Sequence, residues 1–169
     1  MVELRRAEEL SVHVYIIAGL LSIIPISELR GAIPYALANN VPFVAAFILC
    51  TVMNLLVAPA VLLFLSTLHE LFCRMRWYDR AIDRLLARAQ AKVKEKVDRY
   101  GYFGVLLFVA IPLPITGAYT GTLGAWVLGL DRKKTVLAVS AGVVVAGIVV
   151  TVVASLGIEA LSIFVKRGA

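Results

Sequence analysis

Long stretches without Asp, Glu, Lys or Arg constrain the fold of this chain more than any other feature. Four of them cover residues 10–27, 31–69, 100–130 and 135–158, and about 20 apolar residues suffice for a helix to cross a bilayer. Of the 169 residues, 61% are hydrophobic and 17% charged, whereas a soluble domain has about 25% charged residues. Lipid offers no hydrogen-bond partners to an open backbone. The sequence therefore predicts an all-α integral membrane protein.

The two halves of the chain follow one order. Pro25-Ile26-Ser27 in the first half corresponds to Pro114-Ile115-Thr116 in the second. In each half a short apolar segment leads to a break rich in Pro, Gly and polar residues, and then to a second short segment and a long uninterrupted one. This order indicates a duplication within a single membrane domain of residues 1–169, with repeats at about 10–69 and about 101–165.

The breaks predict re-entrant hairpins. A helix over residues 10–24 would rise roughly 22 Å, short of the roughly 30 Å hydrocarbon core. Pro25 lacks a donor, Gly31 permits positive φ and Pro34 can begin a returning helix. In the second half the corresponding positions are Pro112, Pro114, Gly117, Gly121 and Gly124. We expect two inverted repeats, each a re-entrant helical hairpin plus a transmembrane helix, and the alternative is four plain spans.

The segment between the repeats, about residues 70–100, is clearly amphipathic. Arg80, Arg84, Arg88 and Lys92 follow one face at steps of four residues, which predicts a helix lying on the membrane surface. In a membrane chain, basic residues mark the cytoplasmic face and contact anionic lipid. The net charge of +6 thus indicates membrane lipids, not nucleic acid, as partners. Both topologies place this connector in the cytoplasm, and they differ on the side of the termini.

Glu28 and Arg30 are the leading candidate site residues. An ionisable group at membrane depth costs roughly 2.5–3.5 kcal/mol on insertion scales, so it is rarely placed there without a use. In an unwound segment after Pro25 the two side chains could converge on one cavity. Glu28 would then carry a proton or bind a cation, and Arg30 would tune it or hold an anionic headgroup, with Ser27 beside them. The structural alternative is a buried ion pair that fixes the loop.

Other candidates are uncharged. In the second break Thr116, Tyr119 and Thr120 could coordinate a substrate or cation through hydroxyl groups, although small residues there equally permit close helix packing. Asn54 is either a cavity residue or, as we favour, the donor of an interhelical hydrogen bond. The sequence contains no metal-ligand cluster, phosphate-binding loop or nucleophile elbow. We therefore expect no enzyme activity, no metal and no cofactor.

The runs "ISELRGAIPYAL" and "PLPITGAYTGTLGAW" resemble the small multidrug export proteins of prokaryotes over nearly the whole chain. This resemblance implies export of small molecules and a place in the prokaryotic plasma membrane. The paired re-entrant layout is also similar to that of the DedA superfamily, whose members are linked to lipid-carrier translocation and proton-dependent transport. Arginines are expected in the second loop of that superfamily, and residues 111–121 contain none.

Together these features predict a small secondary transporter, proton-coupled through Glu28 and homodimeric. It would move a small amphiphilic or lipid-like substrate through a midplane site between the halves. The first alternative is a flippase for an anionic lipid carrier such as a polyprenyl phosphate, with Arg30 binding the phosphate. The second alternative is a membrane scaffold that transports nothing.

Overall fold

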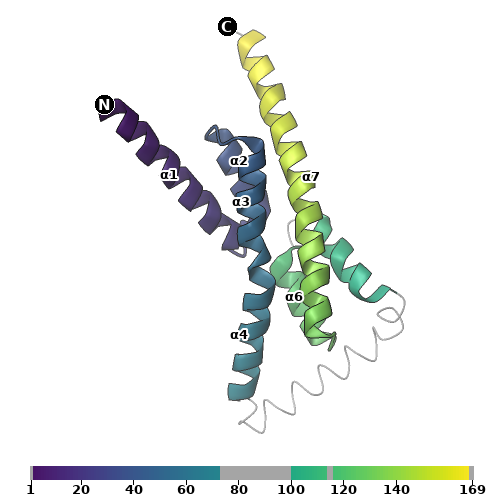
Figure 1. Cartoon of the computed structure of the whole chain (residues 1–169). Coiled ribbons are helices and arrows are strands. Elements are labelled where there is room, and N and C mark those ends of the chain that lie inside the picture. The colour runs from purple at the N-terminus through teal and green to yellow at the C-terminus, as the bar shows by residue number, and fades with distance from the viewer. Residues whose placement is uncertain (1, 73–99, 114–115, 168–169) are drawn as a thin grey trace. The chain divides into compact units, whose positions relative to one another are not determined.

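Helices make up all the regular structure in the described part of the chain. A computed structural model describes residues 2–72, 100–113 and 116–167, and Figure 1 traces their order. The helices are α1 (Val2–Ile23), α2 (Glu28–Ala38), α3 (Phe43–Leu55), α4 (Val57–Phe72), a helix over Tyr100–Ala110, α6 (Ala118–Val127) and α7 (Arg132–Arg167). The predicted all-α class is confirmed. The amphipathic connector, apart from its ends, lies outside the described residues, as does Pro114.

Contacts between residues divide the chain into two compact units. The first unit contains α1, α2, α3 as far as Asn54, and α7 from Val144 onward. The second contains α4, the helix Tyr100–Ala110, α6 and α7 as far as Val143. Each unit therefore holds a pair of helices joined by a break, together with part of each long apolar segment.

In the first unit, α1 and α2 pack against each other as an antiparallel pair, and α3 reverses the chain again (Figure 1). Small side chains let these helices approach closely: Ala18, Ala32, Ala36 and Ala46 are fully buried. The turn from α2 to α3 uses Asn40, whose φ is 62°, because Asn tolerates the left-handed region better than most residues.

In the second unit, α4 packs against α6. The buried core combines Val57, Val109, Ala118, Ala125 and Val139. The α3 helix ends at Leu55 because Pro59, four residues later, has no N–H to donate to its carbonyl oxygen. The α7 helix begins where the Asp131 carboxylate accepts a 3.0 Å hydrogen bond from the Lys134 N–H, which is a capping interaction.

Two helical stretches are long and apolar enough to cross a membrane, judged by length and composition: Phe43–Thr67, with 25 residues, and Arg132–Ile158, with 27. The shorter apolar helices are Val12–Ile23 and Tyr100–Ala110. Large apolar side chains face outward on both long stretches, such as Phe43, 62% exposed, and Val153, 65% exposed. These features are typical of a membrane protein.

Candidate functional site

The first break follows from Pro25. Its ring disfavours helical backbone at the preceding residue, Ile24, and α1 ends at Ile23. The chain then turns over four residues, and the Ile24 carbonyl oxygen accepts hydrogen bonds from the N–H groups of Ser27 and Glu28, at 3.1 and 3.0 Å. Because these bonds close the turn locally, the chain enters α2 directly at Glu28.

Glu28 combines burial with an unusual backbone. Its φ is 45°, in the left-handed region that costs a non-glycine residue of order 1–3 kcal/mol. Only 8% of the residue is exposed, and it is the single acidic residue between positions 12 and 67. A buried carboxyl group at a strained helix start is typical of a functional position.

Three details of the predicted break are corrected. The unwound segment is confined to residues 24–27, so Glu28 and Arg30 lie in the first turn of α2. Pro34 lies inside α2 and does not begin it. Gly31 also lies inside α2, where a methyl group would meet the Ser27 side chain. The reversal is already made at Glu28, so Pro34 is not needed for the turn, whereas Gly31 leaves room for the Ser27 side chain at its end.

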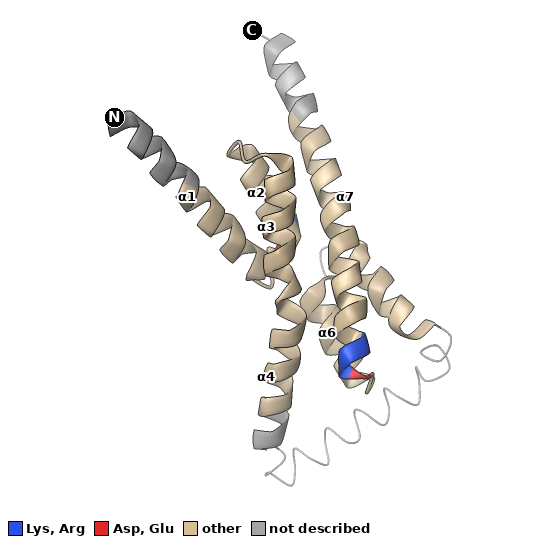
Figure 2. Ribbon diagram, in the orientation of Figure 1, with Lys and Arg blue, Asp and Glu red and all other residues tan. Residues whose placement is uncertain are grey.

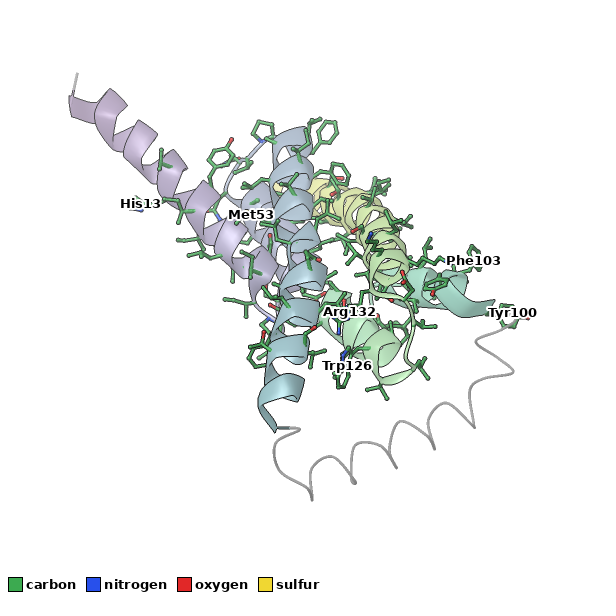
Figure 3. The ribbon with its side chains drawn as sticks, turned by 60° about the horizontal axis from the view of Figure 1, so that its bottom comes forward. His13, Met53, Tyr100, Phe103, Trp126 and Arg132 are labelled. Carbon is green, nitrogen blue, oxygen red and sulfur yellow. The ribbon has the colours of Figure 1, made fainter. Side chains whose placement is uncertain are left out.

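A buried polar cluster lies beside this break, on α1 and α3. The Asn54 side-chain N–H donates a 2.6 Å hydrogen bond to the Ser22 carbonyl oxygen, which is the interhelical bond expected of Asn54. The Ser22 hydroxyl donates to the Ala18 carbonyl oxygen at 2.8 Å. Thr51, one turn before Asn54, is 5% exposed. In Figure 3 the neighbouring Met53 also lies by α1, where its side chain covers Gly19.

Two oxygens of this cluster have no hydrogen-bond partner among the described residues. They are Oδ1 of Asn54 and Oγ1 of Thr51. Buried polar atoms are nearly always satisfied, so an exception requires an explanation such as a water or an ion. The sequence reasoning missed Ser22 and Thr51. The signal was available for Thr51, because two polar residues three positions apart in an apolar helix share one face.

The second break is closed by Thr116. Its hydroxyl donates to the carbonyl oxygen of Ile111 at 2.5 Å and accepts from the N–H of Leu113 at 3.0 Å. These bonds stabilise the irregular backbone that follows Pro112. Gly117 then leads into α6 with an extended backbone. Thr116 therefore has a structural role here, whatever further role it has toward a substrate.

Tyr119 and Thr120 lie in the first turn of α6, where the Thr120 hydroxyl donates to the Gly117 carbonyl oxygen at 3.4 Å. Gly121, predicted as a hinge, lies inside α6, and a methyl group there would meet the Val109 side chain. Its role is thus close packing against the helix Tyr100–Ala110. The predicted residues of the second half are brought together around α6, apart from Pro114.

An apolar pocket of about 330 Å³ lies between α6 and the helix Tyr100–Ala110. Thr120, Gly121 and Gly124 line one side, and Tyr100, Gly104 and Phe108 line the other. Figure 3 shows Tyr100 and Phe103 at the start of this helix. A second pocket, of about 450 Å³, lies in the first unit between α3 and α7, with Phe47 and Thr151 among its lining residues.

Charge is concentrated at few places in the described side chains. Figure 2 shows basic and acidic ribbon together at the start of α7, where the sequence has Asp131, Arg132, Lys133 and Lys134. Lys134 lies over the Tyr102 ring, 5.7 Å from its centre, a cation–π contact. Across the part of the chain that the structure describes, no three His, Cys, Asp or Glu side chains gather as a metal site would require.

Comparison with known proteins gives one match. A family model with the description "Putative small multi-drug export protein" matches residues 28–149. The matched region begins at Glu28, directly after the first break, and includes the second break. No curated protein and no solved structure matches the chain.

Proposed function

The chain belongs to the small multi-drug export protein family, and on that premise we propose that it is a secondary transporter for a small amphiphilic or lipid-like molecule. The transport is coupled to a proton carried by Glu28. The position of Glu28 is the observation that carries the proposal. Its carboxyl group is buried at a strained turn, in a segment that has no other acidic residue for more than 15 positions on either side.

The apolar pocket on α6 supports a substrate of this kind. Its volume of about 330 Å³ falls within the range of roughly 300–1,000 Å³ that is usual for small-molecule sites. Its lining is apolar except for hydroxyl groups such as that of Thr120. An amphiphile could place its apolar part in such a pocket while its polar end meets a hydroxyl group.

We further propose that the short helices form two re-entrant hairpins of an inverted repeat. Helix α2 has 11 residues and α6 has 10, so each rises roughly 15–17 Å, about half of the hydrocarbon core. Both follow a Pro-containing break. Interrupted helices at corresponding places in two halves are the usual sign of a transporter site. Membrane lipids would surround the outward-facing apolar side chains.

The test is transport by purified protein in proteoliposomes that carry a pH indicator inside. Wild type should move protons when candidate amphiphiles are added outside. Glu28→Gln keeps the shape of the side chain and removes its proton, so this variant should insert and fold but lose proton movement. Glu28→Asp should retain part of it. Full proton movement in the Gln variant would exclude Glu28 as the carrier.

A further inference from the structure

We infer that the first unit binds a monovalent cation such as sodium at the buried oxygens of Asn54 and Thr51, beside the end of α1. Only the role of the cation rests on the proposed transport function: it would serve as a second coupling ion. The binding itself follows from the geometry of α1, α3 and α7 within this unit.

Asn54 provides the first oxygen. Its side-chain N–H donates a 2.6 Å hydrogen bond to the Ser22 carbonyl oxygen, and this bond fixes the orientation of the amide. Oδ1 is then left facing the interior, and Asn54 is only 1% exposed. An amide oxygen can only accept, so its partner must be a hydrogen-bond donor or a cation. None of the described residues supplies a donor.

Thr51 provides the second oxygen. Three buried helical hydroxyl groups, those of Ser22, Thr122 and Thr151, donate to the carbonyl oxygen four residues earlier at 2.6–2.8 Å. Thr51 does not, and its Oγ1 has no partner in the described part of the chain. Gly147 of α7 faces this atom, because a Cβ there would lie 2.7 Å from Oγ1. The glycine lets α7 pack closely against this buried hydroxyl with no side chain of its own beside it.

The two oxygens belong to one neighbourhood. Residues three apart on a helix have Cβ atoms about 5–6 Å apart. At this spacing one ion can contact the oxygen atoms of both side chains. Hard cations bind oxygen ligands of this kind, including amide carbonyls. A site of neutral oxygens with little negative charge suits a monovalent ion better than a divalent one.

The electrostatics of the break favour a cation over a water molecule. The C-terminal end of α1 carries the negative end of its helix dipole, and the Ser22 carbonyl oxygen marks that end. Glu28 lies six residues after Ser22. Its N–H donates a 3.0 Å hydrogen bond to the Ile24 carbonyl oxygen, so this acidic residue belongs to the turn that follows α1. Ends of interrupted helices bind sodium ions or protons in this way in transporters.

The experiment measures the unfolding temperature of purified full-length protein in nanodiscs, with NaCl or choline chloride at equal ionic strength. Ligands that bind only the folded state raise this temperature in proportion to the logarithm of concentration. Wild type should therefore become more stable as sodium replaces choline. Thr51→Val removes Oγ1 at nearly constant shape and should require about tenfold more sodium, or more, for the same rise.

Two further variants serve as controls. Thr51→Ser keeps the hydroxyl group and should respond like wild type. Thr122→Val removes another buried helical hydroxyl, in the second unit, and should also keep the wild-type response. If Thr51→Val does not fold, Thr51→Ala against Thr51→Ser makes the same comparison.

Equal unfolding temperatures of wild type in sodium and choline would overturn the inference, as would an unchanged sodium response in Thr51→Val. Substrate-driven proton movement in sodium-free proteoliposomes is measured on the same preparations. Transport without a sodium response rejects the cation site and leaves the proposed function intact. A Thr51-dependent sodium response without transport of any tested amphiphile supports the site and counts against the proposed function.

Discussion

The Asn54 side chain donates a 2.6 Å hydrogen bond to the Ser22 carbonyl oxygen, and this bond joins α3 to the end of α1. Ser22 is the second-to-last residue of α1, where carbonyl oxygens have no helical N–H partner. The bond therefore satisfies a helix end that is fully buried. It also holds the first break at a fixed position on α3, next to the strained Glu28.

Replacing Asn54 with Ala should lower the free energy of unfolding by about 1–2 kcal/mol. Interhelical hydrogen bonds in membranes contribute about 0.6 kcal/mol on average and up to about 1.7, and the truncation also leaves a cavity. Chemical unfolding in detergent micelles measures this change. The control is Asn39→Ala. Asn39 makes a similar 2.8 Å bond, to the Tyr35 carbonyl oxygen, but it is exposed and local, so its loss should cost less than about 0.5 kcal/mol. Equal losses would contradict the role assigned to Asn54.

A second prediction concerns the contact of α3 with α7 in the first unit. A methyl group on Gly147 would lie 2.7 Å from Thr51 Oγ1 and 3.0 Å from the Phe47 ring. Gly147→Ala should thus reduce the free energy of unfolding by about 1–3 kcal/mol. Gly157, on the same helix, has no atom within 4 Å of its added Cβ. Gly157→Ala should be neutral or stabilising by up to about 1 kcal/mol, and a loss as large as that of Gly147→Ala would contradict the packing argument.

The long apolar segments were predictable because their signal is local. The stretch 31–69 without charged residues contains the span Phe43–Thr67, and the end of α1 follows from Pro25 alone. The pairing of Asn54 with Ser22 joins residues that lie 32 positions apart in the sequence. A single sequence does not encode such contacts as a pattern. For the same reason Gly31 and Pro34 were read as a break although they lie inside α2.

A third prediction uses Val109 to separate two close contacts in the second unit. A Cβ on Gly121 would meet Val109 Cγ2, whereas a Cβ on Gly142 would meet Val109 Cβ at 2.7 Å and the Leu106 carbonyl oxygen at 2.8 Å. Val109→Ala removes Cγ2 and keeps Cβ. Gly121→Ala should therefore cost about 1 kcal/mol less in the Val109→Ala background than in wild type.

Gly142→Ala should keep most of its cost in both backgrounds. Its two closest contacts, Val109 Cβ and the Leu106 carbonyl oxygen, remain in Val109→Ala, and only Val109 Cγ1, at 3.0 Å, is removed. The two double-mutant cycles are measured by thermal or chemical unfolding in micelles. Rescue of Gly142→Ala by Val109→Ala, or no rescue of Gly121→Ala, would show that the two contacts are assigned wrongly.

Arg30 separates the proposed transporter from a flippase for an anionic lipid carrier. No basic residue lies between positions 100 and 131, so Arg30 is the one cation in either break among the described residues. For an amphiphile transporter, Arg30→Gln should leave binding of lipid phosphate to purified protein unchanged. A strong loss in Arg30→Gln, with part of the binding kept in Arg30→Lys as a point charge without the planar fork, would favour the flippase.

The last prediction concerns topology, on which the re-entrant layout depends. If both pairs of short helices enter and leave on one side, each half contributes a single crossing. The basic start of α7, Arg132–Lys134, then lies on the same side as the connector, in the cytoplasm as the positive-inside rule requires. The 27-residue stretch Arg132–Ile158 crosses once and places the C-terminal tail outside. Four plain spans would place residue 133 outside and the tail inside.

Single cysteines replace Ala89 or Lys133 in a background without Cys50 and Cys73. A membrane-impermeant reagent then labels them in intact cells or in inverted vesicles. A tag after Ala169 is probed in the same way. Labelling of residues 89 and 133 only from the cytoplasmic side, together with an external tag, is the expected result, because one crossing separates Lys133 from the tail. Labelling of residue 133 from outside, with a cytoplasmic tag, would replace the re-entrant hairpins by four complete spans. The break at Glu28 would then join two crossing helices.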